Sequence, residues 1–488
     1  MILQNDMFRF CCKLTAKYEF YLYSLDRQIS KNLNDSGVET RPVKTNGLWC
    51  FILLPTVLIL YSLLLEVSPS YTLVAYTSVG LLFYCMLFTL FLSLSCVILK
   101  ESMYGGCIAS SLISTLLMYV ILGKGLAFSL LFSLPTVFAY SVLLRTVLMK
   151  CPKTFTIGEA MVVTQAITLF IVMIIANMIY GIEIEDNELY LVNVIVYTVL
   201  ITVGLLIVVL YVMPDDMRNM TNLGYIVMGG LAFLLLVLQV MLGIPYVVKY
   251  IFKDETRTYI LGFWLSLVCM SIIVLLLRTK LAVKADTVAR KTFHILASLV
   301  FLSGILHDLC LMKLAAGVGL GALIFIEALR KSGIEPISSA LQSAFLIYCD
   351  EKDCGVFAVT PVYLFAGLAC PLALVPGGAR PRRLELLSGV LALGVGDTAA
   401  SWLGSRYGHN KWPGGTRTLE GTAFNILSQV ATVYALEMFD LLSTRNTVVR
   451  AVVAATASGL VEARTDQVDN LILPLVTIVA FQSTLFLS

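Results

Sequence analysis

The segment from Gly394 to Thr422 concentrates residue types that bind phosphate groups. Seven of its 29 residues are glycine, against 33 of 488 in the whole chain, so glycine is strongly enriched here. Glycine lets backbone N–H groups approach an anion closely and adopt the positive φ angles of a phosphate-binding nest. Cations and hydroxyls bind phosphate oxygens, and a carboxylate can hold Mg²⁺ against them. These residue types indicate a nucleoside triphosphate site that lacks the Walker sequence. The polar members are Thr398, Ser401, Thr416, Thr418, Thr422, Lys411, Arg417, Asp397 and Glu420.

Helical spacing relates four small or polar residues of this segment. Asp397, Ser401, Gly404 and Gly408 follow one another at intervals of four, three and four, which places them on one face of a helix. We expect that helix to begin near Gly396, with Asp397 in its first turn. A stripe of small residues also suits close helix packing in a membrane without any ligand. Packing does not explain the charged residues that follow, so the whole segment favours a ligand site.

An acidic group precedes the last apolar run of the chain. Glu462, Asp466 and Asp469 lie within eight positions, and on a helix they would share one face. Because like charges repel, we expect a cation to compensate them, either Mg²⁺ or arginines such as Arg464. The alternative is an ordinary charged loop at the membrane boundary. Ionisable groups at the edge of a span are nevertheless functional candidates.

A basic group begins an earlier apolar run. Arg290 and His294 are four residues apart, hence on one helix face, and Lys291 lies between them. Histidine can act as a general base because its unperturbed pKa lies near neutrality. The alternative is that these basic residues anchor the cytoplasmic end of a helix. Glu327 and Arg330 are three apart at the end of another run, and we expect them to form a structural ion pair.

These polar groups belong to a chain that is otherwise strongly apolar. It is 59% hydrophobic and 13% charged, with a mean hydropathy of +0.89, whereas soluble domains are about 45–50% apolar and about 25% charged. A bilayer span needs roughly 20 mainly apolar residues. The composition therefore predicts an all-α polytopic integral membrane protein with about 13–15 transmembrane helices. Six runs lack Asp, Glu, Lys and Arg altogether: Leu48–Leu65, Ser102–Gly123, Gly125–Leu144, Leu189–Pro214, Leu223–Val248 and Tyr259–Leu277.

Three regions of the chain differ in their polar residues. Residues 1–46 carry seven Lys and Arg residues and no early apolar core, which predicts a cytoplasmic tail rather than a cleavable signal peptide. Residues 47–280 alternate long apolar runs with short polar joints, as in a transmembrane scaffold. Residues 281–488 have shorter runs and richer joints, as in a catalytic region. The net charge of +3 predicts no nucleic-acid partner, and the twelve cysteines show no C-x-x-C spacing that would predict a zinc site.

Ordered motifs from about Arg290 to the end of the chain resemble those of the dolichol kinase family. The glycine-rich segment looks like the CTP-binding region of that family, and the acidic and basic groups look like its closing motif and its earlier basic motif. One departure is Thr416-Arg417, where the family pattern has two adjacent basic residues. The motifs read Gly396-Asp-Thr-Ala-Ala-Ser, Lys411-Trp-Pro-Gly, Arg417-Thr-Leu-Glu-Gly-Thr, Glu462-Ala-Arg-Thr-Asp-Gln-Val-Asp-Asn and Arg290-Lys-Thr-Phe-His.

The resemblance implies an endoplasmic-reticulum membrane enzyme with a cytosolic nucleotide loop. It implies that CTP, with Mg²⁺ or another divalent cation, phosphorylates the terminal hydroxyl of dolichol. We expect Asp397, Lys411, Arg417, Glu420 and His294 in catalysis, with Asp397, Glu420 and His294 in that order as general base. Asp397, Asp466 and Asp469 are the expected metal ligands. The expected nucleotide-binding residues are Arg290, Lys291, Gly394, Gly396, Thr398, Ser401, Gly404, Lys411, Trp412, Pro413, Gly414, Gly415, Thr416, Arg417, Thr418, Glu420, Gly421 and Thr422.

Three alternatives to this function stay open on the sequence. Related CTP-using membrane kinases phosphorylate diacylglycerol or phytol-like alcohols, although the tail motif and the long N-terminal half favour dolichol. A lipid cytidylyltransferase would release pyrophosphate instead of CDP. A transporter would place ionisable residues near the middle of its spans, whereas the long N-terminal runs of this chain contain none.

Overall fold

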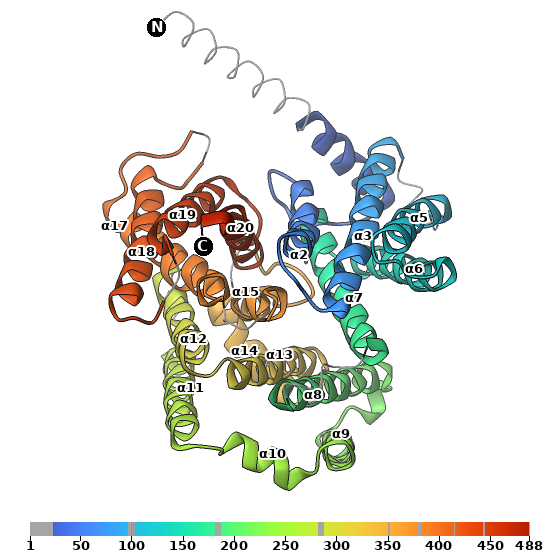
Figure 1. Cartoon of the computed structure of the whole chain (residues 1–488). Helices are drawn as coiled ribbons and strands as arrows, with labels where there is room; N and C mark the ends of the chain where they lie inside the picture. The colour runs from blue at the N-terminus through green and yellow to red at the C-terminus, as the bar shows by residue number, and fades with distance from the viewer. Residues whose placement is uncertain are drawn as a thin grey trace, which may run out of the picture. The chain divides into compact units, whose positions relative to one another are not determined.

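The computed structural model describes residues 23–95, 99, 101, 103–180, 187–281, 287–349, 352–377, 382–413, 415–442 and 445–487. In these residues the secondary structure is helical, apart from one isolated antiparallel bridge between Lys411 and Thr418 (Figure 1). The contacts divide the chain into two compact units. The first holds Met1–Ala176 with Cys354–Val356, and the second holds Asn177–Asp353 with Phe357–Ser488.

The first unit is a bundle of apolar helices. A buried ion pair between Arg41 and Glu159 joins the segment before the bundle to the start of its last helix. Ser68 caps one helix by accepting a hydrogen bond from the Tyr71 N–H at 3.3 Å, as N-cap serines do. The helices are α2 (Leu53–Leu64), α3 (Pro69–Leu94), α5 (Tyr104–Val120), α6 (Leu126–Lys150) and α7 (Ile157–Tyr180), after a 3₁₀ turn at Leu48–Ile52.

The second unit contains the remaining helices and all of the predicted site motifs. Within it α18 packs against α17 and α19, α20 packs against α15 and α19, and α12 packs against a π-helical segment at Val390–Asp397. The α-helices are α8 (Asn187–Val212), α9 (Met220–Met241), α10 (Ile244–Ile251), α11 (Glu255–Leu281), α12 (Thr287–His307), α13 (Leu309–Lys331), α14 (Ile337–Tyr348), α15 (Val359–Leu374), α16 (Arg383–Leu386), α17 (Thr398–Tyr407), α18 (Leu419–Met438), α19 (Thr447–Arg464) and α20 (Asp469–Ser483), with 3₁₀ turns at Asp215–Met217 and Leu485–Leu487.

The apolar runs fold into helices that can cross a bilayer. Among the described residues, seven helices are long and apolar enough to span, and five apolar helices are shorter. The prediction of an all-α polytopic membrane protein is therefore confirmed, while the total of about 13–15 spans stays a prediction. The seven long helices are Pro69–Leu94, Leu126–Lys150, Ile157–Tyr180, Glu188–Val212, Met220–Met241, Glu255–Arg278 and Leu309–Lys331.

The helix that carries Asp397 does not begin near Gly396, so that prediction is wrong. Helical backbone runs through the π-helical segment directly into α17, which places Asp397 in mid-helix. Two glycines make this path possible, because a Cβ on Gly394 would lie 2.1 Å from Ser298 Oγ and one on Gly396 2.5 Å from Asn425 Oδ1. A π-helical turn widens a helix locally and often occurs at functional sites.

Candidate phosphate-binding site

A polar cavity of about 480 Å³ opens in the second unit where several helix ends meet. The glycine-rich segment, the acidic group and the basic group all contribute to its wall, although 106 residues separate Lys291 from Asp397. The cavity is lined by Arg290, Lys291, His294, Lys352, Thr360, Asp397, Ala400, Ser401, Gly404, Ser405, Thr416, Arg417, Thr418, Gly421, Thr422, Glu462, Val468, Asp469 and Asn470.

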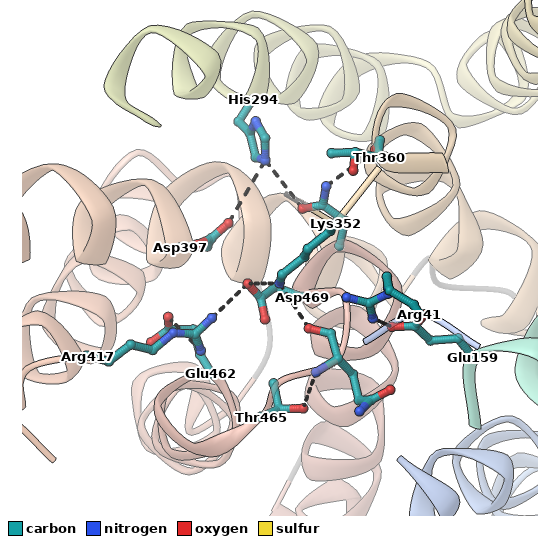
Figure 2. A network of polar contacts seen from close by, with 12 residues as sticks. Arg41, Glu159, His294, Lys352, Thr360, Asp397, Arg417, Glu462, Thr465 and Asp469 are labelled. Atoms are coloured by element: carbon teal, nitrogen blue, oxygen red, sulfur yellow. Dashed lines mark hydrogen bonds and ion pairs between the residues drawn. The ribbon is translucent and has the colours of Figure 1, made fainter. Parts of the chain in front are cut away.

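Asp397 is the buried carboxylate on the α17 side of the cavity, with 3% of its surface exposed. Lys291 from the first turns of α12 donates to Asp397 Oδ2. His294 Nε2 lies 4.0 Å from the same oxygen, as Figure 2 shows for His294 and Asp397. Lys291 Nζ lies 3.5 Å from His294 Nε2. A carboxylate, a primary amine and an imidazole therefore converge at one point of the wall.

Arg417 bridges the two carboxylates of the acidic group. Its guanidinium lies 3.0 Å from Glu462 Oε1 and 2.9 Å from Asp469 Oδ2, as Figure 2 shows. Lys352 Nζ reaches the same Asp469 oxygen at 3.3 Å and the Gln467 carbonyl at 3.1 Å. Burial lowers the pKa of Arg417, but the charges of Asp469 and Glu462 outweigh it, so the net pKa is raised and Arg417 stays cationic.

Glu462 lies in the last turn of α19, which is not among the apolar spans of the described chain. Burial raises the pKa of its carboxyl group from 4.5 to about 7, although the nearby Arg417 charge favours ionisation. The desolvation of the carboxylate therefore outweighs its ion pair. Glu462 can therefore change charge near neutral pH directly beside Arg417.

The acidic residues do not share one helix face, which corrects the prediction. Because α19 ends at Arg464 and α20 begins at Asp469, a short turn separates Glu462 from Asp469. Asp466 lies in that turn and is not part of the cavity wall. The expected compensating cation is present, but it is Arg417, while Arg464 stacks over the Trp412 ring at 5.3 Å.

Asn470 lies between His294 and Thr360. Its Nδ2 donates to the Thr360 carbonyl at 3.5 Å, and its Oδ1 lies 3.3 Å from His294 Nε2. A hydrogen bond to this amide oxygen requires a proton on Nε2, whereas a hydrogen bond from the Lys291 ammonium at 3.5 Å requires an Nε2 without a proton. Both tautomers of His294 therefore have a partner at Nε2.

Lys411 lies outside the cavity and is exposed. It pairs with Thr418 in an isolated bridge, and the Trp412 N–H donates to the Arg417 carbonyl at 2.9 Å. The Trp412 indole donates to Thr422 Oγ1 at 3.0 Å. This turn therefore holds Arg417 at the start of α18, and Arg417 alone of the two predicted cations reaches the cavity.

Several other predicted nucleotide-binding residues have structural contacts instead. Thr398 Oγ1 donates to the Leu393 carbonyl at 3.2 Å. Gly404 and Gly421 do line the cavity, but they also allow α17 and α18 to approach, since a Cβ on Gly404 would lie 3.0 Å from the Gly421 Cα. The close approach of α17 and α18 confirms the packing role of the small-residue stripe, while a role in ligand binding stays a prediction. The predicted residues outside the cavity wall are Gly394, Gly396, Thr398, Lys411, Trp412, Pro413, Gly415 and Glu420, and Gly414 lies outside the described residues.

Glu420 is half-buried outside the cavity, and its carboxylate accepts hydrogen bonds from its own turn. It accepts from the Asn410 N–H and from the Asn410 side chain at 2.7 Å. Hydrogen bonds from backbone N–H groups keep the pKa of Glu420 below its usual value. A carboxylate with a lowered pKa outside the cavity is a poor general base, so Glu420 is a weaker candidate for that role than Asp397, which lines the cavity.

The carboxylates fit a divalent cation only in part. Within the described ranges, no group of three His, Cys, Asp or Glu side chains is arranged to hold a metal ion. Asp469 nevertheless has a buried Oδ1 without a hydrogen-bond partner, and Asp397 lines the same cavity. Carboxylate oxygens are the ligands that Mg²⁺ prefers, and Mg²⁺ commonly uses one or two of them together with substrate phosphates.

Lys352, Thr360 and Asn470 line the cavity, although none of them is among the predicted site residues. Lys352 lies in an acidic run that looks like a surface loop, and Thr360 stands alone at the start of an apolar run. Asn470 directly follows the predicted metal ligand Asp469, and this neighbour in the sequence could have indicated that Asn470 lies at the site. Thr360 has no sequence feature that would identify it, because only the packing of α15 on α20 brings it to the site.

Fold and site together define a polytopic membrane protein with a cation-rich cavity suited to phosphate groups. The dolichol kinase family model matches residues 74–412, more than half of the chain, and the chain belongs to the dolichol kinase family.

Relatives in other organisms support this membership. Bovine dolichol kinase is 31% identical over 347 residues, which are 66% of this chain and 64% of the bovine protein. Human dolichol kinase is 30% identical with the same coverage, and the enzyme of Saccharomyces cerevisiae is 29% identical over 47% of this chain and 43% of its own. The match thus spans slightly less than two thirds of the mammalian relatives. No solved structure matches the chain.

Proposed function

We propose that this protein is a dolichol kinase that transfers the γ-phosphate of CTP to the terminal hydroxyl of dolichol. We place it in the endoplasmic-reticulum membrane with the cavity open to the cytosol. One observation supports the proposal above all: motifs far apart in the sequence meet in a single cavity lined by four cations and three carboxylates, namely Arg290, Lys291, Lys352, Arg417, Asp397, Glu462 and Asp469. The relatives named dolichol kinase support the acceptor.

Three of the cavity cations have a carboxylate partner that a phosphate can replace. Lys291 is held by Asp397, whereas Lys352 and Arg417 are held by Asp469. Triphosphate oxygens would compete for these cations, and the released carboxylates would then be available to a divalent cation. Asp397 and Asp469 are the residues placed to hold it. When bound, it would neutralise charge on the phosphates.

The transfer step follows from these positions. The acceptor hydroxyl oxygen forms a bond to the γ-phosphorus, while the bond from that phosphorus to the bridging oxygen breaks and CDP leaves. The hydroxyl proton passes to the Asp397 carboxylate, which is the group best placed as base. Lys291 and Arg417 stabilise the charge on the transferred group, as preorganised cations do in phosphoryl transfer.

Purified protein in detergent or lipid tests this function directly. We expect γ-labelled CTP to transfer its label to dolichol, with ATP a poorer donor, and we expect CDP as the nucleotide product. Diacylglycerol and phytol serve as competing acceptors in the same assay. Preferential labelling of either lipid would change the assigned acceptor, and release of pyrophosphate would identify a cytidylyltransferase instead.

The titration of Glu462 predicts a pH dependence of nucleotide use. Its carboxyl pKa is raised to about 7, so it is mostly neutral at pH 6 and mostly ionised at pH 8. The ionised form holds Arg417 more strongly and repels the phosphates. We expect kcat/KM for the nucleotide to fall as pH rises through 7, by about tenfold at most.

The Glu462→Gln variant isolates this effect. Its side chain is neutral at every pH, so the component of the fall that Glu462 causes should vanish, while the titration of the nucleotide itself remains. Identical pH profiles for the two proteins, measured over pH 6–8, would contradict the role given to Glu462.

A further inference from the structure

One hydroxyl in the wall of the cavity has no hydrogen-bond partner within the protein. Thr360 Oγ1 is buried, and no described residue donates to it or accepts from it. The backbone around it is satisfied, because the Thr360 N–H donates to Asp353 Oδ1 at 3.0 Å and its carbonyl accepts from Asn470 Nδ2 at 3.5 Å. A buried hydroxyl without a partner carries an uncompensated desolvation penalty. The position is therefore suited to a polar group of a ligand.

The chemistry around Thr360 fits an alcohol better than a phosphate. A threonine hydroxyl both donates and accepts, and so does the hydroxyl of an alcohol, whereas a phosphate mainly accepts. The Thr360 carbonyl accepts from the Asn470 amide at 3.5 Å, and the Oδ1 of that amide lies 3.3 Å from His294 Nε2. The Asp353 carboxylate near Thr360 is occupied by the Thr360 N–H, so the groups left for a ligand here are uncharged, in contrast to the side of the cavity where Arg417 bridges Glu462 and Asp469.

The two helices that carry Thr360 and Asn470 are mainly apolar. Thr360 is the second residue of α15 and Asn470 the second residue of α20, and both helices are among the shorter apolar helices of the chain. They pack against each other. Because α20 is buried along most of its length, a lipid alcohol with its hydroxyl at Thr360 would lay its hydrocarbon chain along the partly exposed apolar positions of α15 rather than in the cationic part of the cavity.

We infer that Thr360 and Asn470 form the subsite for the hydroxyl of the lipid acceptor. Thr360 Oγ1 binds the acceptor oxygen directly, and Asn470 is a positioning residue that holds the Thr360 carbonyl and His294. The inference rests on the proposed kinase function. It assigns the binding site of the lipid alcohol, while the cations of the cavity bind the nucleotide. A change at Thr360 should therefore affect the alcohol and leave the nucleotide unaffected.

The test compares Thr360→Val, which keeps the shape and removes the hydroxyl, with Thr360→Ser, which keeps the hydroxyl. Loss of one neutral hydrogen bond predicts that kcat/KM for dolichol falls about 5- to 10-fold in the valine variant. The serine variant should stay within about twofold of the parent. The KM for CTP, measured at saturating dolichol, should be unchanged in both. A shift in the CTP KM, or full dolichol turnover by the valine variant, would overturn the subsite.

Binding without turnover separates this inference from the proposed function. Tritiated short-chain polyprenol is equilibrated with the purified full-length proteins in the absence of nucleotide. Weaker binding by the valine variant, with normal binding by the serine variant, supports the subsite even if no phosphate is transferred, and such inactivity would overturn the kinase proposal alone. Equal binding by all three proteins would overturn the subsite alone if the parent is an active kinase.

Discussion

The Asp397→Asn variant is expected to lose phosphoryl transfer by at least about 1,000-fold while the protein still inserts into the membrane. The substitution keeps the shape of the side chain, so the buried packing at the junction of the π-helical segment and α17 is preserved. The amide cannot accept the proton of the acceptor hydroxyl, and it removes the counter-charge of Lys291. Both roles given to Asp397 are therefore lost together. Label transfer from γ-labelled CTP to dolichol is the measurement.

A matched control distinguishes this effect from a general effect of an Asp to Asn change. Asp215 has a side chain that is 94% exposed and forms only a surface pair with Arg218 at 3.3 Å. Asp215→Asn should retain full turnover and the same elution profile in detergent. Near-normal turnover by Asp397→Asn would refute the assignment of Asp397. Aggregation of that variant alone would show that the carboxylate is needed for folding.

The class of fold could be predicted because a bilayer imposes a simple rule on the sequence. Backbone groups in lipid must bond within their own helix, so a long run without charge predicts one spanning helix. Runs such as Tyr259–Leu277 accordingly lie within α11. The rule is weaker for the catalytic region, where α15 and α20 are only 16 and 15 residues long. Helices that line a polar site are shielded from lipid by protein, so their hydropathy is a poorer guide.

The main site motifs could be predicted because they consist of residue types that are rare in an apolar chain. Asp397, Arg417 and Asp469 stand out on charge alone, and the structure brings all three to one cavity. The role of Lys411 was harder to predict, since a turn of a few residues decides whether Lys411 or Arg417 faces inward. Thr360 has no charge or motif, and its position depends wholly on tertiary packing.

Helix continuity was the other feature that spacing alone could not predict. An interval of four and then three suggests a single helix face for Glu462, Asp466 and Asp469, yet α19 ends before Asp466. The break reverses the chain, so that Glu462 from the end of one helix and Asp469 from the start of the next face the same arginine. Two helix ends can thus build an ion cluster that one continuous helix would spread over about 10 Å.

The Arg417→Gln variant is expected to lose about 100- to 1,000-fold in kcat/KM for the nucleotide. Arg417 is the only residue of the described chain shown to bridge both Glu462 and Asp469, and its fork geometry suits paired oxygens of a phosphate. Arg417→Lys keeps the charge but not the fork, so an intermediate loss is expected. Arg406→Gln is the matched control, because Arg406 is exposed on α17 beside Tyr407 and should tolerate the change.

A double variant separates the catalytic role of Arg417 from its role in balancing charge. In Arg417→Gln the buried Glu462 loses its cationic partner, so its pKa should rise further and the fold is expected to be less stable above pH 7. Adding Glu462→Gln removes that unpaired acid and should restore the thermal stability measured in detergent. Activity should not return, because the phosphates still lack their cation. Recovery of turnover in the double variant would show that Arg417 serves only to neutralise its carboxylate neighbours.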